Sequence, residues 1–312
     1  MGGSGGGWFG GITSNNANLD REVSNAADSA RYDAAANEYL QGLLADYNSR
    51  DTEKIKKHIE TLQKAIERDI EGETETLFGG SVRKHTYVDG LSDIDVLFVV
   101  NNSSLADASA AQVLSYFEQR IAERLSGLGV NVEAGKLAIT VSYSDGTEIQ
   151  VLPAIKKANG VHIPSADGSK WSSVVRPQEF VKKLTSINQA NGGKVVPIIK
   201  LFKGLQTHLP DSSQLKGYHI ESLAIEAFRG YTGRQTPKDM LRHFVEYSSL
   251  RVNRPIADIT GQSLHVDDYL GGANSQERQR VSGALTRFAK RLEASEKRGS
   301  IDDLRSILGD NS

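Results

Sequence analysis

The stretch GGSVRKHTYVDGLSDIDVLF, from Gly79 to Phe98, decides how this sequence is interpreted. Asp93 and Asp95 stand one residue apart at the start of an apolar run that is typical of a strand. Side chains at i and i+2 of a strand point to the same side, so we expect the two carboxylates roughly 6–7 Å apart along the chain. Like charges repel at this range, and a divalent cation with oxygen ligands removes the repulsion. The pair therefore predicts a Mg²⁺ site.

A glycine-serine turn precedes the aspartates and fits the same hypothesis. Glycine, as in Gly79 and Gly80, lets the backbone approach an anion closely, and Ser81 adds a hydroxyl beside the free N–H groups of the turn. Taken alone, an Asp-x-Asp pair more often lies at an ordinary strand end, and a Gly-Gly-Ser turn indicates even less. The combination, with about eleven residues from Ser81 to Ser92, favours a nucleoside triphosphate held between turn and metal.

The composition suits a globular protein that acts on a small anionic substrate. The 312 residues, 38% hydrophobic and 24% charged, are enough for one large domain or two ordinary ones. A net charge of −2 lacks the basic excess of a protein that wraps long nucleic acid, although a local basic patch stays open. The absence of cysteine excludes disulfides and thiolate metal sites and is compatible with the cytoplasm. No apolar run is long enough to span a membrane, and the glycine-rich start lacks the features of a secretory signal.

The hydrophobic pattern divides the chain into three parts. Residues 1–28 are rich in Gly, Ser and Asn, and we expect a flexible arm there. Residues 29–165 begin with two helical patterns, the first near 29–47, and continue with short strand-like runs. Residues 166–312 are mostly helical. This order predicts an α+β fold with a small mixed sheet, a helical second lobe, and a site between them.

Two local signals are specific enough to be tested against the structure. Two strand-like runs flank Asp145 and Gly146, which is a strong hairpin signal, and Pro153 is expected to end the second strand. Residues 274–298 repeat apolar side chains at helical spacing, and Gly299 is expected to cap that helix.

Several other polar and aromatic residues have an ordinary structural interpretation. We expect Trp171 and Phe180 to pack in the interior rather than stack on a base. His265, Asp267 and Asp268 could bind a metal, but an exposed loop is favoured. A set of basic residues near the C-terminus is interpreted as a solvated helix face rather than a polynucleotide patch, and comprises Arg278, Arg280, Arg287, Lys290 and Arg291.

Beyond these local signals, GGSVRKHTYVDGLSDIDVLF resembles the signature of the DNA polymerase β-like nucleotidyltransferases, a Gly-Ser turn followed by an Asp-x-Asp strand. Later segments resemble further regions of that superfamily: VSYSDGTEIQVLPAI, VVPIIKLFKGL, LKGYHIESLAIEAF and ITGQSLHVDDYL. Together they are most similar to the oligoadenylate synthase and cyclic GMP–AMP synthase branch, especially the bacterial cGAS/DncV-like nucleotidyltransferases. The resemblance spans roughly residues 30–300. It implies a nucleotidyltransferase core over 29–165 and a helical substrate-binding domain over 166–312.

The resemblance also implies a two-metal nucleotidyl transfer and assigns roles to residues. Asp93 and Asp95 would bind two Mg²⁺ or Mn²⁺ ions, and Gly80 and Ser81 would hold the leaving phosphates. The helical lobe would add three nucleotide contacts: Lys200, Lys203 and Tyr218, the last by stacking on the base.

One position departs from the family pattern. The third acid usually stands three residues before the proline of the second core strand, where this chain has Gln150. A neutral amide is a poor ligand for Mg²⁺ and a poor general base. Glu148, two residues earlier, lies on the same strand face and is the expected third acid. A register shift, or an enzyme weakened at position 150, would also explain the sequence.

The resemblance implies that the enzyme joins nucleoside triphosphates, with ATP among them, into a cyclic di- or trinucleotide. This second messenger would act in bacterial anti-phage defence, with a nucleotide-activated effector downstream and a regulatory protein as partners. One alternative is a linear nucleotidyltransferase that makes oligonucleotides or extends an RNA end. Another, motivated by Gln150, is a nucleotide-binding pseudoenzyme.

Overall fold

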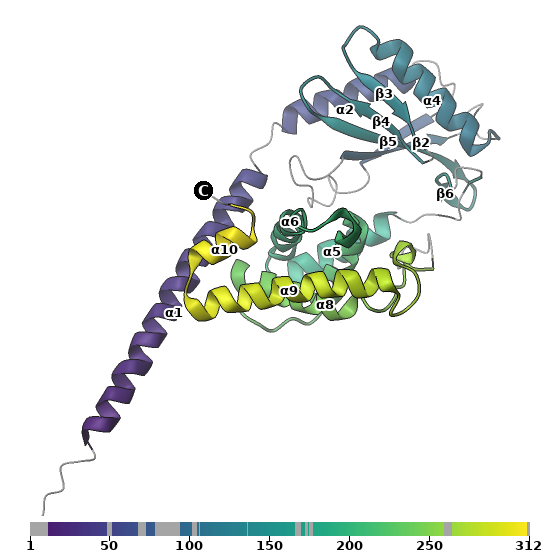
Figure 1. Cartoon of the computed structure of the whole chain (residues 1–312). Helices are drawn as coiled ribbons and strands as arrows, with labels where there is room; N and C mark the ends of the chain where they lie inside the picture. Colours follow the sequence, from purple (N-terminus) through teal and green to yellow (C-terminus); the bar gives the residue numbers. More distant parts are fainter. Residues whose placement is uncertain are drawn as a thin grey trace, which may run out of the picture.

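The computed structural model describes residues 12–48, 52–67, 73–78, 94–101, 105, 107–135, 137–165, 170–171, 174, 177–258 and 264–310. In this part of the chain, a lobe built on one mixed sheet stands apart from a lobe of packed helices, and a long N-terminal helix runs beside the helical lobe (Figure 1). None of these helices combines the length and the apolarity needed to cross a membrane. The arrangement confirms the predicted α+β fold.

The sheet has the strand order β1-β2-β5-β4-β3, with β6 beside β5. The central strands β2 and β5 are parallel, and the other neighbouring pairs are antiparallel. The strands are β1 (Glu73–Phe78), β2 (Ile94–Asn101), β3 (Asn131–Ala134), β4 (Ile139–Ser142), β5 (Glu148–Lys157) and β6 (Gly160–His162). The predicted hairpin is present between β4 and β5, where Gly146 adopts a φ of 83°, a conformation that favours glycine.

Two helices cover one face of the sheet and form its core. They are α2 (Thr52–Glu67) and α4 (Ala110–Leu125). Ile59, Ile66 and Phe117 from these helices pack against Val96 and Ile149 of the central strands. In Figure 1 the two helices lie on the far side of the sheet from the helical lobe. The opposite face carries a smaller apolar cluster of Leu97, Val99 and Ala154.

The helical lobe has a separate and larger core. It is formed by α5 (Pro177–Ala190), α6 (Val195–Gln206), α7 (Gly217–Ala227), α8 (Pro237–Arg251), α9 (Gln276–Arg298) and α10 (Ile301–Ile307), with short 3-10 turns η1 (Asp211–Ser213) and η2 (Asp268–Leu270). The apolar face predicted for residues 274–298 is buried in this core as part of α9. Gly299 caps α9 with a φ of 63°, as expected.

The first helix, α1 (Ile12–Tyr47), packs on the helical lobe although it precedes the sheet in the chain. Tyr32, Ala36 and Leu40 are buried in the core of that lobe. Polar contacts add to this packing, because Lys238 of α8 lies 2.7 Å from Asp33 and also pairs with α9. The helical lobe therefore contains residues from both ends of the sequence.

Two local expectations are wrong. Helix α1 begins at Ile12, so it occupies much of the segment in which the composition indicated a flexible arm. Strand β5 continues through Pro153 to Lys157. On the side away from β2, strand β5 pairs with β4 up to Val151 and with β6 from Ile155 onward. Pro153 falls between these two segments, where its missing N–H removes no bond to either strand.

Candidate functional site

The central strands bring together two of the positions that the sequence singled out. In the parallel register of β2 and β5, Asp95 lies opposite Gln150. Residues paired in register share a sheet face, and alternation along β5 adds Glu148 to the same face. Their neighbours Val96 and Ile149 are buried against α2 and α4. Positions 95, 148 and 150 therefore belong to the face away from those helices.

The structure describes the predicted acids unequally. Glu148 is the exposed first residue of β5, and Gln150 is half-buried. For Asp95 the backbone position alone is described, while Asp93, Gly80 and Ser81 lie outside the described residues. Within the part of the chain that is described, no cluster of three or more His, Cys, Asp or Glu side chains could hold a metal ion.

The turn that leads into Glu148 is anchored to α2. Asp145 in this turn accepts from the Lys54 ammonium at 2.8 Å and contacts the His58 ring at 2.9 Å. The hydrogen bond from Lys54 is the largest cause of a lowered pKa of Asp145. The His58 ring also stacks on Tyr143, with centroids 3.7 Å apart. These contacts fix the start of β5 and thereby the backbone position of Glu148.

On the helical lobe, Lys203 of α6 is buried beside Glu221 of α7. The Lys203 Nζ lies 3.6 Å from the Glu221 Oε1, and the two side chains are only 6% and 1% exposed. A Cβ built on Gly217, the first residue of α7, would lie 3.6 Å from the same Nζ. The Lys203 charge is thus located beside the N-terminal turn of α7. In Figure 1, α5 and α6 lie on the side of the helical lobe nearer the sheet.

Tyr218 and Lys200, the other two residues predicted to contact the nucleotide, are each held by a residue of a neighbouring element. Tyr218 is half-buried, with its ring 4.5 Å from that of Phe180 and its hydroxyl donating to Asp258 at 2.8 Å. Lys200 donates to the side chain of Asn48, just beyond the end of α1. Phe180 is 2% exposed, which confirms that it is a packing residue.

Trp171 is confirmed as a packing residue as well. It is partly buried against the core of the sheet lobe, and its indole N–H donates to the Ala108 carbonyl at 2.9 Å.

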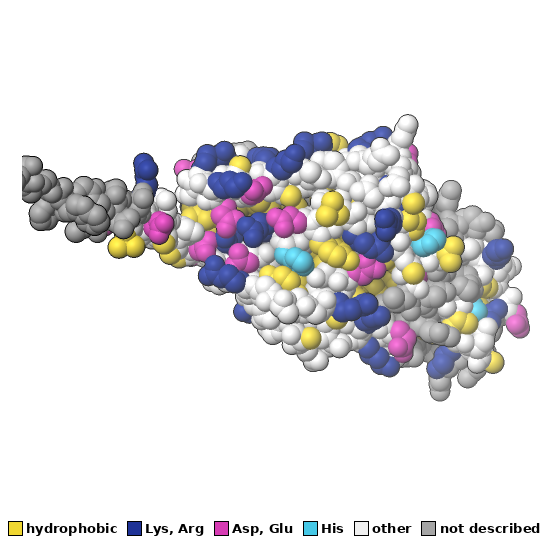
Figure 2. Space-filling view, turned by 90° about the horizontal axis from the view of Figure 1, so that it is seen from below, with side chains coloured by type: hydrophobic (Ala, Val, Ile, Leu, Met, Phe, Trp, Pro, Cys, Tyr) yellow, Lys and Arg dark blue, Asp and Glu magenta, His cyan; other side chains and the backbone are white. Residues whose placement is uncertain are grey.

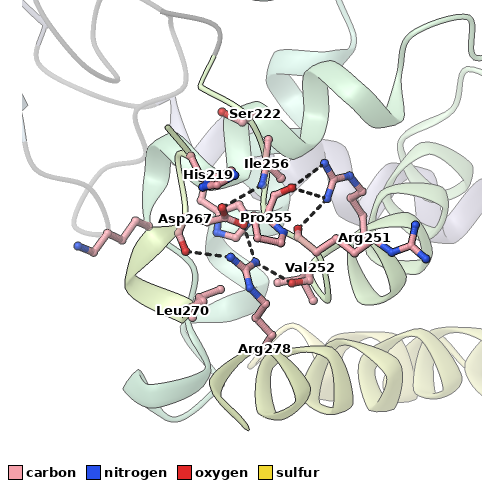
Figure 3. Close-up of polar contacts among 12 residues, drawn as sticks. His219, Ser222, Arg251, Val252, Pro255, Ile256, Asp267, Leu270 and Arg278 are labelled. Carbon is pink, nitrogen blue, oxygen red and sulfur yellow. Dashed lines mark hydrogen bonds and ion pairs between the residues drawn. The ribbon is translucent and has the colours of Figure 1, made fainter. Parts of the chain in front are cut away.

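A buried ion pair contradicts two sequence-based interpretations. Arg278 and Asp267 are both fully buried and lie 2.6 Å apart (Figure 3). Arg278 also donates to the carbonyls of Val252, Gly271 and Gly272. Asp267 is therefore not part of an exposed loop, and Arg278 is not on the solvated face of α9. The other four basic residues of that set are exposed, as expected: Arg280, Arg287, Lys290 and Arg291.

His219 of α7 completes this buried cluster. Its Nε2 lies 3.5 Å from the Asp267 Oδ2 and has no hydrogen-bond partner among the described residues. Burial lowers the pKa of His219 to about 4, so the ring is neutral at pH 7. Burial tends to raise the pKa of Asp267, but the hydrogen bonds from Arg278 and the Ile256 amide outweigh it and lower this pKa. The cluster joins α7, α9 and the segment that leads to Asp258 (Figure 3).

The sequence interpretation did not identify Glu221 or Asp258. A signal existed for Glu221, because it interrupts an apolar run in α7 just as Lys203 does in α6. No comparable signal marks Asp258, whose bond to Tyr218 spans 40 positions.

Surface charge varies over the face seen in Figure 2. Basic and acidic side chains are interspersed over its middle, whereas Lys and Arg follow its upper edge with few acidic neighbours. Several of them are paired, including Arg242 with Glu296 at 2.6 Å. This distribution agrees with the net charge of −2.

Comparison with known proteins identifies a known domain in this chain. The profile of the SMODS family, the second messenger oligonucleotide or dinucleotide synthetase domain, matches residues 35–188. The match includes the Asp-x-Asp strand, β5 and the hairpin before it. No curated protein matches the sequence.

Solved structures support the same fold over nearly the whole chain. CdnC from E. coli MS115-1 with ATP is 17% identical, with a TM-score of 0.63, covering 87% of this chain and 97% of that one. CdnG from Bradyrhizobium diazoefficiens with GTP is 16% identical, with a TM-score of 0.63, covering 90% and 96%. The DncV cyclic AMP-GMP synthase of Vibrio cholerae with a linear intermediate is 10% identical, with a TM-score of 0.62, covering 96% and 91%.

At these sequence identities the solved structures show the fold alone, and the profile match identifies the domain. The matched domain is described as one that synthesises oligonucleotide or dinucleotide second messengers, and its range includes Asp93 and Asp95. Residues 35–188 therefore form a second messenger oligonucleotide or dinucleotide synthetase domain, and the chain has the fold of the cGAS/DncV-like nucleotidyltransferases.

Proposed function

We propose that this enzyme joins nucleoside triphosphates into a cyclic di- or trinucleotide that signals phage infection in a bacterial cytoplasm. The observation that carries the proposal is the match of a second messenger synthetase domain to the segment that contains Asp93 and Asp95. The register of Asp95 beside Gln150, with Glu148 on the same sheet face, supports it.

The acids of the sheet are suited to a divalent metal. Asp93, Asp95 and Glu148 would hold two Mg²⁺ or Mn²⁺ ions, since carboxylate oxygens are the hard ligands that these ions prefer. Glu148 is exposed on the correct face, which fits this role. When bound, the ions would supply charge for the triphosphate and activate the attacking ribose hydroxyl.

The remaining residues would bind and orient the nucleotide. Lys203 would contact the triphosphate from the helical lobe, and Gly80 with Ser81 would contact it from the sheet lobe. Tyr218 would stack on the base, with its ring angle set by the bond to Asp258. Lys200, bonded to Asn48, would add positive charge near the same helix.

The partners follow from the proposed product. A cyclic-nucleotide-activated effector would act downstream, and a regulatory protein would control synthesis. Among the similar structures, E. coli MS115-1 CdnC is found in a complex with HORMA, which supports a regulatory partner here.

Product analysis tests the proposal directly. The purified protein is incubated with mixed labelled NTPs and Mg²⁺ or Mn²⁺, and the products are treated with phosphatase and examined by mass spectrometry. We expect a phosphatase-resistant cyclic product from the natural protein and none from the Asp93→Asn/Asp95→Asn double variant. If the two preparations behave identically, the proposed catalysis is wrong.

Two alternative functions predict different results in this experiment. A linear nucleotidyltransferase would give phosphatase-sensitive products in the same experiment. A nucleotide-binding pseudoenzyme is favoured by Gln150, which lies opposite Asp95 where a carboxylate is usual in the family. It would bind NTP tightly and give no product.

A further inference from the structure

Lys203 and Glu221 form an ion pair in a place where charge is costly. Lys203 lies in LFKGL of α6 and Glu221 lies in HIESLAI of α7, and most of the neighbouring residues are apolar. Their neighbours Phe202, Leu205 and Ile220 are fully buried. A buried ion pair often stabilises a fold no better than two apolar residues would. Stability alone therefore gives little reason for this pair.

The contact between the two groups is an ion pair rather than a tight hydrogen bond. Charge-assisted N–H···O bonds are about 2.7–2.9 Å long. The Lys203 Nζ and the Glu221 Oε1 are 3.6 Å apart. Arg278 and Asp267, in the same lobe, are 2.6 Å apart, so the fold does form the shorter contact elsewhere. At the longer distance the carboxylate still favours the charged ammonium and orients it.

The position of the ammonium points to an anion. Gly217 has no side chain, and a Cβ there would lie 3.6 Å from the Lys203 Nζ. The ammonium therefore lies beside the first turn of α7, where backbone N–H groups have no partner within the helix and the helix dipole is positive. Glu221 is four residues after Gly217 and hence on the same helix face. The Lys203 ammonium and the positive end of the α7 helix dipole therefore lie on the same side of α7 as the Glu221 carboxylate.

We propose that Glu221 is a positioning residue that holds the Lys203 ammonium charged and directed toward the start of α7, where it meets the substrate triphosphate. This inference rests on the proposed function, because it assigns Lys203 to the triphosphate. Glu221 itself would not touch the nucleotide. Its effect would pass entirely through Lys203.

The test measures ATP affinity with Mg²⁺ by calorimetry for the natural protein and three variants: Glu221→Gln, Lys203→Met and the double variant. We expect each single substitution to weaken ATP binding at least tenfold, the scale of one hydrogen bond to a charged group. Since Glu221 acts through Lys203, the double variant should bind ATP no more weakly than Lys203→Met. AMP affinity should not change, because AMP lacks the outer phosphates.

A matched control is available on the same helix. Glu226 of α7 pairs with Arg251 at 2.6 Å, five residues beyond Glu221. Glu226→Gln removes an ion pair from α7 without involving Lys203, so its ATP affinity should equal that of the natural protein. A general loosening of α7 would instead weaken ATP and AMP binding in both Glu→Gln variants.

Several outcomes would overturn the inference. Unchanged ATP affinity in Glu221→Gln would do so, as would losses that multiply in the double variant. If Glu221→Gln fails to fold, Glu221→Asp retains the charge but moves it away from Lys203 by one methylene, and unchanged ATP affinity there would count equally against the inference. If the natural protein binds no ATP, the proposed function itself is wrong, a result distinct from all of these.

Discussion

Replacing Arg278 by Met should destabilise the helical lobe more than any exposed basic substitution on α9. The variant leaves Asp267 fully buried and without its cationic partner, although the Ile256 amide still donates to Asp267 at 3.0 Å. It also removes the donor to the Val252 carbonyl at 3.0 Å. Methionine fills much of the volume, so the loss is mainly electrostatic.

The expected magnitude follows from the burial of both partners. Breaking a buried ion pair on one side costs about 3–5 kcal/mol, because an uncompensated charge remains. For a unit of the size of the helical lobe, each kcal/mol lowers the melting temperature by about 2–4 °C, so the expected decrease is about 6–20 °C. The measurement is thermal unfolding followed by circular dichroism, with urea unfolding for the free energy.

Arg280→Met is the matched control, because Arg280 is exposed on the same helix two residues later. Its stability should stay within about 0.5 kcal/mol of the natural protein. The double variant Arg278→Met/Asp267→Asn should recover part of the loss, since no charge is left buried alone. Equal stability of Arg278→Met and Arg280→Met would refute the reasoning.

Three further predictions concern other contacts. Gly204→Ala should destabilise the protein by about 1–3 kcal/mol, because the new Cβ would collide with the Tyr47 ring of α1. Gly283→Ala should instead stabilise it by up to about 1 kcal/mol in urea unfolding, because the new Cβ would make only an ordinary contact, 3.6 Å from the Arg287 Nη1. The folded pKa of His219, about 4, is below its unfolded value of 6.5, so the natural protein should lose about 3 kcal/mol of stability as the pH falls from 6.5 to 4, and His219→Gln should lack that component in unfolding curves measured across the range. Gln150→Asp should lower the Mg²⁺ concentration for half-maximal product formation, because it adds a carboxylate at the register position beside Asp95; an unchanged Mg²⁺ dependence would contradict this.

The sequence predicted best those features that depend on neighbouring residues. Helical periodicity located α9, and the left-handed cap at Gly299 followed from local rules. Strand β5 was placed but ended too early. The effect of Pro153 depends on which strands flank β5, and this is decided by pairing between distant segments.

Features that depend on distant residues could not be predicted. Arg278 and Asp267 look like solvated charges in sequence, and only the packing of α9 against the preceding loop buries them together. The partner of Lys203 was not identified for the same reason, because the sequences of α6 and α7 do not show which of their charged side chains lie together. The acids at positions 93 and 95 could be singled out because their spacing in the sequence is enough to indicate a metal site. Their roles stay predictions.

The packing of α1 has a consequence for how the protein is made. The Tyr32 hydroxyl contacts the Ser295 hydroxyl at 2.9 Å, across 263 positions of the chain. At ribosomal speeds of about 5–20 residues per second, α1 waits roughly 10–50 s after its synthesis before that partner exists. During this interval its apolar side chains are open to water or to chaperones, so newly made chains should depend on such protection more than the mature enzyme does.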